Sequence, residues 1–345
     1  MNIPYRTRRR LRHFFLGAGA VLLLVVLVLV LWMMWLNRYV IYSRDGAKID
    51  FSLSAQHAPG EIASEPPPGE TVHIENKLPD DYEEEVNKEL VRFSGYYVTL
   101  TELTEQFDQV SARLDALPAG STVMLELKSR SGYTYYSSSV AVVNPNFDTT
   151  KIDNLIQTLI KRGHYVIAQI PAFMEYYYIL EDQMEHGGFG LRQQGSVGLW
   201  LDPEMRCWWL DPSNDGTVTY MIQLLTELRK MGVDEVVFSN YRFPDTENIV
   251  FEGDRMSALN ATAATLVKAC STDTFCVSFT RSYADLNLPA GRTRLYLTGV
   301  SAANAASMAE KTGFADPSIQ LVFLTDLNDT RYDQFCVLRP LDNMH

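Results

Sequence analysis

The stretch Glu235-Val-Val-Phe-Ser-Asn-Tyr-Arg-Phe-Pro244 decides the fold of this 345-residue chain. It begins with a short apolar run, passes into the polar residues Ser239 and Asn240, and ends in Arg-Phe-Pro. Short apolar runs are typical of parallel strands that are buried on both faces. In a barrel of such strands, the polar residues that follow each strand lie at the mouth, where barrel proteins carry their sites.

Similar runs recur after residue 92 and alternate with amphipathic segments. The expected strands cover residues 96–99, 122–128, 165–170, 235–238, 275–279, 294–297, 320–324 and 335–338. The expected helices cover residues 103–117, 152–163, 220–231, 256–269 and 302–311, whereas residues 282–292 are too irregular for a full helix. Eight strands with mostly helical crossovers in about 250 residues predict a (β/α)8 TIM barrel of the α/β class. A doubly wound open sheet is the structural alternative.

A long aromatic segment separates the third and fourth expected strands, from Glu175 to Asp215. It is long for a connection between a strand and a helix, which favours a functional lid. Its rings include Tyr177 and Trp209, and flat rings with polar rims can bind sugar faces. Packing of a long loop over the barrel explains the same residues equally well.

The N-terminal region predicts a membrane anchor. Residues 14–36 carry no charge and are long enough to span the hydrocarbon core of a bilayer. Residues 1–13 hold five Arg and no acid, so they are expected to form a cytoplasmic basic tail. Residues 37–345 are then expected outside the plasma membrane of a single-pass protein. A cleaved signal peptide is the alternative, but no small-residue cleavage site follows the apolar run.

Residues 37–92 are expected to hold a hairpin and a linker, followed by the barrel over residues 93–345. The hairpin is indicated by alternation around Asp45-Gly46, a dipeptide typical of primed turns. A Pro-rich stretch and an acidic run then predict a stiff, solvated linker.

The charge of the chain excludes one class of partner. Its net charge is −12, although the first 13 residues are strongly basic. An acidic remainder argues against binding to nucleic acid. The four Cys and six His show no metal-ligand spacing, so neither a metal nor a cofactor is expected. Buried free thiols are the simplest explanation of the Cys residues, with a Cys270–Cys276 disulfide as the alternative.

Five stretches, in order from about residue 95 to Pro244, resemble a family of TIM-barrel domains of unknown function that are taken for glycoside hydrolases. The last stretch is similar to the family's Phe-Asp-Tyr-Ile-Arg-Phe-Pro, with Ser239 in place of the acid. Glu126 and Lys128 are similar to the family's Asp-Val-Lys-Asp. Gln169 and Glu175 stand where the third strand of the family has Arg and Asp. Trp209-Leu-Asp-Pro212 matches its Trp and Asp-Pro. The resemblance implies a glycosidase-like barrel.

Glycoside hydrolysis normally needs two carboxyl groups that flank the scissile bond. The candidates at expected strand ends are Glu126, Glu175, Asp211 and Asp326. Each also has a structural explanation. Glu126 and Lys128, two residues apart on a strand, can form a buried pair inside the barrel. The other three acids suit loops, turns or helix entries.

Ser239 cannot replace the missing acid, because a hydroxyl does not transfer protons as a carboxyl does. The sequence therefore predicts a divergent, non-catalytic barrel that binds an envelope glycan or an envelope protein. The expected binding residues are Lys128, Gln169, Tyr177, Trp209, Ser239, Asn240 and Arg242. The alternative is an active glycosidase that acts on a cell-envelope or extracellular polysaccharide with a relocated carboxylate pair.

Overall fold

The computed structural model describes residues 40–43, 46–49 and 90–343. The chain divides into two compact units, Met1–Asp80 and Asp81–His345.

The described part of the first unit is a hairpin. β1 (Val40–Ser43) pairs antiparallel with β2 (Gly46–Ile49), as the alternation around Asp45-Gly46 predicts. The predicted membrane helix over residues 14–36 lies outside the described residues. Among the helices that are described, none is both long enough and apolar enough to cross a bilayer.

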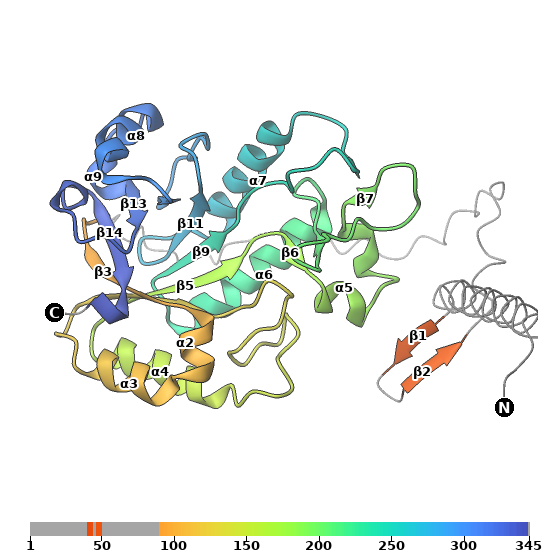
Figure 1. Ribbon diagram of the computed structural model, residues 1–345, viewed down its shortest axis with the longest axis horizontal. Helices are drawn as coiled ribbons and strands as arrows, with labels where there is room; N and C mark the ends of the chain where they lie inside the picture. Colours follow the sequence, from red (N-terminus) through yellow and green to blue (C-terminus); the bar gives the residue numbers. More distant parts are fainter. Residues whose placement is uncertain (1–39, 44–45, 50–89, 344–345) are drawn as a thin grey trace, which may run out of the picture. The chain divides into compact units, whose positions relative to one another are not determined.

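The second unit is built on a closed barrel of parallel strands that follow one another in chain order. The strands are β3 (Ser94–Val98), β4 (Thr122–Glu126), β5 (Tyr165–Pro171), β9 (Glu235–Ser239), β11 (Cys276–Arg281), β12 (Leu295–Thr298), β13 (Leu321–Leu324) and β14 (Cys336–Pro340). The barrel closes where β14 pairs with β3, and Figure 1 shows these first and last strands side by side. Closure confirms the TIM-barrel prediction and excludes the open doubly wound sheet.

The crossovers carry helices on the outside of the barrel (Figure 1). They are α2 (Leu100–Glu105), α3 (Phe107–Asp115), α4 (Thr150–Lys161), α6 (Asp215–Met231), α7 (Arg255–Cys270), α8 (Ala305–Thr312) and α9 (Pro317–Gln320). The single helix expected over residues 103–117 is wrong in detail, because the backbone breaks the helix at Gln106. The connection from β11 to β12 has no helix, as its irregular sequence predicts.

Local sequence explains where the long helices begin and end. Asn214 accepts hydrogen bonds from the first amides of α6, and Asp254 does the same for α7. Gly232 ends α6 with φ +97°, a backbone conformation that glycine adopts without strain.

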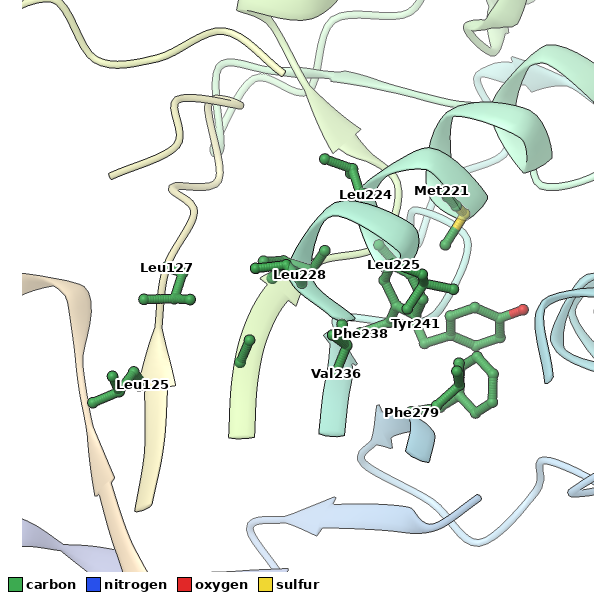
Figure 2. Close-up of a cluster of buried hydrophobic side chains, with 14 of the residues drawn as sticks. Leu125, Leu127, Met221, Leu224, Leu225, Leu228, Val236, Phe238, Tyr241 and Phe279 are labelled. Atoms are coloured by element: carbon green, nitrogen blue, oxygen red, sulfur yellow. The ribbon is translucent and has the colours of Figure 1, made fainter. Parts of the chain in front are cut away.

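The main core lies between the barrel and its helices. Figure 2 shows Leu225 and Leu228 of α6 pointing toward Val236 and Phe238 of β9. All four side chains are fully buried, and burying one such side chain stabilises the fold by about 1.5–3 kcal/mol. The alternate residue of β9, Val237, faces the other way and belongs to a second cluster inside the barrel, together with Met124, Ile167, Tyr296, Val322, Cys336 and Leu338.

A charged network lies inside the barrel among the first residues of its strands. The Glu235 carboxylate, at the start of β9, accepts hydrogen bonds from Arg294 Nη1 at 2.6 Å and from the hydroxyls of Tyr165 and Tyr296 at 2.9 Å each. Arg294, directly before β12, also donates to the carbonyl oxygens of Ile319 and Val91. The network fills the end of the barrel at which the strands begin. The mouth is the opposite end, where the strands finish.

The segment between β5 and α6 forms an excursion outside the barrel. It contains β6 (Met174–Glu175), α5 (Tyr177–Glu181), η3 (His186–Phe189), β7 (Arg192–Gln193) and β8 (Trp208–Trp209). β6 pairs with β8, and β7 pairs with β10 (Ile249–Val250). Short two-residue strands therefore organise the aromatic segment and join it to the loop after β9.

Further 3-10 turns of the described barrel unit lie at η4 (Ala302–Asn304), η5 (Thr330–Tyr332) and η6 (Leu341–Asn343). All four cysteines are free and buried, so the alternative Cys270–Cys276 disulfide is not formed.

Candidate functional site

Two clefts lie at the mouth of the barrel and share Thr298, the last residue of β12. The acidic cleft, of about 590 Å³, is lined by Tyr97, Val98, Thr99, Met124, Glu126, Gln169, Thr298, Gly299, Val300, Ser301, Leu324, Thr325, Asp326 and Leu327. The arginine cleft, also of about 590 Å³, is lined by Asn240, Tyr241, Arg242, Phe243, Pro244, Asp245, Arg255, Met256, Leu259, Thr280, Arg281, Ser282, Tyr283, Asp285 and Thr298.

Two of the four candidate carboxyl groups meet in the acidic cleft. Glu126 is the last residue of β4, and Asp326 follows the end of β13. Their strands are far apart in sequence, but the closed barrel brings both strand ends to one mouth. Gln169, in register with Glu126 on the neighbouring strand, lines the same cleft.

The two carboxyl groups have different surroundings. Glu126 is half-buried, and its Oε2 accepts a hydrogen bond of 2.9 Å from the Leu100 amide. Asp326 is exposed. Burial raises the pKa of Tyr97, and the negative charges of Asp326 and Glu102 add to that shift. The cleft therefore carries two carboxyl groups, one half-buried and held by a backbone amide and the other exposed.

Glu175 lies away from both clefts and is completely buried. Its Oε1 accepts hydrogen bonds from the Lys128 ammonium and from the Tyr220 hydroxyl, the latter at 2.8 Å. Burial raises the pKa of the Glu175 carboxyl, while Lys128 and Tyr220 lower it in part. Glu175 therefore joins β6 to Lys128, which follows β4, and to Tyr220 of α6. Its carboxyl group is not accessible to a substrate in the mouth.

The predicted Glu126–Lys128 pair is wrong, although Lys128 is indeed buried. The prediction needs strand alternation to continue through residue 128, but β4 ends at Glu126. Lys128 then forms an isolated antiparallel bridge with Thr134, and its ammonium reaches Glu175 instead.

Gly132 fits closely over the buried pair. Its φ is +101°, and a Cβ added there would lie 2.2 Å from Glu175 Oε2. Both the backbone conformation and the lack of space require glycine at this position. Gly132 follows the stretch that is similar to the family's Asp-Val-Lys-Asp, and it lies against the Glu175 carboxyl group.

Asp211 has the role of a turn residue. Its Oδ1 accepts hydrogen bonds from the backbone amide and the hydroxyl of Ser213, at 2.8 and 2.7 Å, just before α6. This is the local pattern by which Asp initiates a turn. Like Glu175, Asp211 lines neither mouth cleft.

Ser239 ends β9 at the position where the resemblance places the family's acid, and Asn240 follows the strand. Ser239 is buried, and its carbonyl oxygen accepts from the Ala172 amide at 2.9 Å. Asn240 has φ +51°, in the left-handed region that Asn tolerates better than most residues, and it lines the arginine cleft. The strand end that would offer an acid thus offers a buried hydroxyl and an amide.

The arginine cleft lies above β9 and β11. Arg242 Nη1 donates to the Phe243 carbonyl oxygen at 3.0 Å, and its guanidinium lies 5.1 Å from the centroid of the Trp209 ring. Arg281 is held by Asp285 and donates to the Tyr241 carbonyl oxygen at 2.7 Å. Arg242 therefore braces its loop and also lines the cleft.

The aromatic residues of the excursion pack mainly on protein. Tyr177 stacks on Tyr133 with a centroid separation of 3.6 Å, and Tyr176 stacks on Trp208 at 4.8 Å. Trp209 is fully buried and donates from Nε1 to Asp202 at 3.0 Å. None of these five rings lines either mouth cleft.

The clefts are also lined by residues that are not predicted from the sequence, namely Tyr97, Arg255 and the Arg281–Asp285 pair. Arg281 could have been found, because it ends β11 as Ser239 ends β9, and residues at strand ends meet at the mouth. Arg255 gave no comparable signal, since it begins a helix. No group of three or more His, Cys, Asp or Glu in the described part of the chain is placed to hold a metal ion.

Comparison of the barrel with solved structures finds glycoside hydrolases. The GH20 exo-β-N-acetylglucosaminidase of Vibrio harveyi matches with 10% identity and a TM-score of 0.49, over 72% of this chain and 50% of the enzyme. The α-galactosidase of Lactobacillus brevis matches with 11% identity and a TM-score of 0.49, over 74% of this chain and 38% of the enzyme. The chain thus spans half or less of the length of these enzymes.

A hypothetical protein from Ruminiclostridium thermocellum matches with 18% identity and a TM-score of 0.44, over 54% of this chain and 96% of that protein. No curated protein is detectably similar in sequence. A family model matches residues 95–272, which is more than half of the chain and includes β3 to α7 of the barrel. The chain belongs to this family, which is described as "Putative glycosyl hydrolase domain".

Proposed function

We propose that this protein is a membrane-anchored, extracytoplasmic barrel that binds a glycan of the cell envelope at its mouth without hydrolysing it. The observation that carries the proposal is the chemistry of the strand ends. β9, which leads into the Arg-Phe-Pro that is similar to the family's, ends in the buried Ser239 where the resemblance places an acid.

The four candidate carboxyl groups do not have the surroundings that a replacement for the missing acid needs. Glu175 is sealed against Lys128, and Asp211 is engaged in a turn. A glycosidase needs one carboxyl group kept protonated by burial or by a neighbouring charge. Of the two acids that line the acidic cleft, Asp326 is exposed and Glu126 accepts a hydrogen bond from a backbone amide.

The acidic cleft nevertheless suits a sugar. It combines hydrogen-bonding groups, including Gln169 and Thr298, with the ring of Tyr97. A small number of polar groups in a partly apolar cleft is the usual composition of a small-molecule site.

Hydrolysis is the second candidate function, and one observation favours it: Glu126 and Asp326 line the same cleft. In that case Glu126, fixed by the Leu100 amide, and Asp326 would flank the bond that is cleaved. The replacement of the family's acid by Ser239 would then mean that the acid pair has moved to the ends of β4 and β13.

Binding and turnover can be measured on the same preparations. The full-length protein in detergent should retain envelope glycans on a glycan array and release no product from them on long incubation. Glu126→Gln and Asp326→Asn, which keep the shape of the cleft, should leave the absence of product unchanged. Hydrolysis by the natural protein that falls about 10²-fold or more in either variant would overturn the proposal and establish the second candidate.

The anchor is tested separately. Residues 14–36 are uncharged and follow a basic tail, so the barrel is expected outside the cytoplasmic membrane. Protease added to intact spheroplasts should digest the barrel and leave a cytoplasmic marker intact. Full protection of the barrel, or its release as a soluble form from untreated cells, would contradict the anchor.

A further inference from the structure

We propose that the arginine cleft binds the oxyanion of an acidic glycan, a carboxylate or a phosphate, with Arg242 and Arg255 as its direct ligands. This inference rests on the glycan-binding function proposed above and names the class of glycan. Both clefts belong to one mouth, since Thr298 lines each of them.

The first argument is the number of donors that the protein leaves available. A guanidinium carries five N–H groups. Arg242 donates one hydrogen bond, to Phe243, and Arg255 donates one, to the carbonyl oxygen of Thr246 at 3.0 Å. Within the described part of the chain, the other N–H groups of these two side chains have no acceptor.

Arg281 provides the contrast. Its Nε and Nη2 donate to the two carboxylate oxygens of Asp285, and its Nη1 donates to Tyr241. This third guanidinium is therefore satisfied by the protein and neutralises one of the two acids in the lining. The other acid, Asp245, is exposed.

The second argument is preorganisation. Both available guanidinium groups contact Phe243: Arg255 lies over its ring at 5.7 Å from the centroid, and Arg242 bonds to its carbonyl oxygen. Arg242 also lies over the buried ring of Trp209. A contact with a ring restrains a guanidinium, and its planar fork matches a carboxylate or phosphate in a bidentate manner.

The third argument is electrostatic. Arg255 is the first residue of α7, a helix of 16 residues, where the helix dipole favours an anion and disfavours a cation. An arginine at this position, in the same cleft as Arg242, is locally unfavourable. A local conflict of this kind is typical of a functional position, and a bound oxyanion would relieve it.

The lining also offers a surface for the sugar ring. Tyr283 lines the arginine cleft and is 69% exposed, unlike the packed rings of the excursion. An acidic sugar can place its charged group between Arg242 and Arg255 and one face of its ring on Tyr283. The neutral part of the glycan would continue past Thr298 toward the acidic cleft.

Isothermal titration of the full-length protein in detergent tests this assignment with three oligomers: an oligogalacturonate, the same oligomer fully methyl-esterified, and a glycerol-phosphate oligomer. We expect the uncharged ester to bind more weakly than at least one of the two anions by about ten-fold or more, and salt to weaken anion binding. The preferred anion identifies the source of the oxyanion.

Three variants assign the residues. Arg242→Gln and Arg255→Gln should each weaken anion binding by about ten-fold or more, since each loses a charge-assisted contact. The control is Arg113→Gln on the outer helix α3, whose side chain is 45% exposed and lines neither cleft. If Arg242→Gln proves unstable in thermal melts because its loop loses support, Arg255→Gln decides the result alone.

Two results would overturn the inference. One is equal binding of the ester and both anions; the other is anion binding by Arg255→Gln that matches Arg113→Gln. If neutral glycans on the array still bind in either case, the proposed function stands and only the acidic class is wrong. If no glycan binds at all, the proposed function fails with it.

Discussion

Lys128→Met is expected to destabilise the barrel by about 3–5 kcal/mol, because it leaves the Glu175 carboxyl buried without its charged partner. Lys128 and Glu175 side chains are 0% and 1% exposed, so water cannot replace the lost contact. Urea unfolding of the full-length protein in detergent gives the free energy. Lys151→Met, at an exposed position on α4, is the control and should cost far less.

The double variant Lys128→Met/Glu175→Leu separates the loss of the pair from the loss of one partner. Replacing a buried ion pair by apolar residues is often close to neutral. The double variant should therefore recover most of the stability. If Lys128→Met costs no more than Lys151→Met, or the double variant is worse than the single one, the pair does not have the role described.

The destabilisation caused by the single change Lys128→Met should depend on pH. Burial raises the pKa of Glu175 above its usual value of 4.5 in the folded state, and Lys128 opposes that rise. For an acid with a raised folded pKa, stability falls as the pH rises above the unfolded value, because the folded state binds the proton more tightly. Without Lys128 the pKa rises further, so the penalty should be smaller at about pH 5 than at about pH 8.

Much of the barrel could be predicted because its strands carry their own signal. Parallel strands buried on both faces need apolar residues throughout, so the apolar runs within the predicted strands 235–238 and 320–324 stand out. Gly232 marks the end of α6 for an equally local reason. The excursion after β5 gave no such signal, because its two-residue strands depend on partners far along the chain.

The fate of each carboxyl group could not be predicted from the sequence. Glu126 and Glu175 both sit at strand ends, yet one lines the mouth and the other is sealed under Gly132. That difference depends on Tyr220 of α6 and on the residue at which β4 ends. The sequence next to each acid indicates neither of these features. Strand ends show which residues can meet at a mouth, but tertiary packing decides which of them face it.

Arg294→Met is expected to lower the free energy of unfolding more than any of the other single changes. The loss of the charge should cost about 3–5 kcal/mol, and the loss of its hydrogen bonds to carbonyl oxygens should add to that cost. Glu235 would stay buried with two tyrosine hydroxyls and no positive charge. The carbonyl oxygens of Ile319 and Val91 would each lose a donor, and both lie on chain segments that lead into barrel strands.

A graded series tests whether the charge or the packing is responsible. Tyr165→Phe removes one hydrogen bond to the same carboxylate and keeps the ring, so it should cost about 1–3 kcal/mol. Arg331→Met, on an arginine that is 56% exposed and paired with Asp329, should change the free energy of unfolding by less than about 1 kcal/mol. The expected order in urea unfolding is therefore Arg294→Met, then Tyr165→Phe, then Arg331→Met. A buried carboxylate that loses its cation lowers the stability of the fold unless the surrounding residues rearrange to pair with it. An effect of Arg294→Met as small as that of Arg331→Met would therefore show that the barrel does not depend on this network.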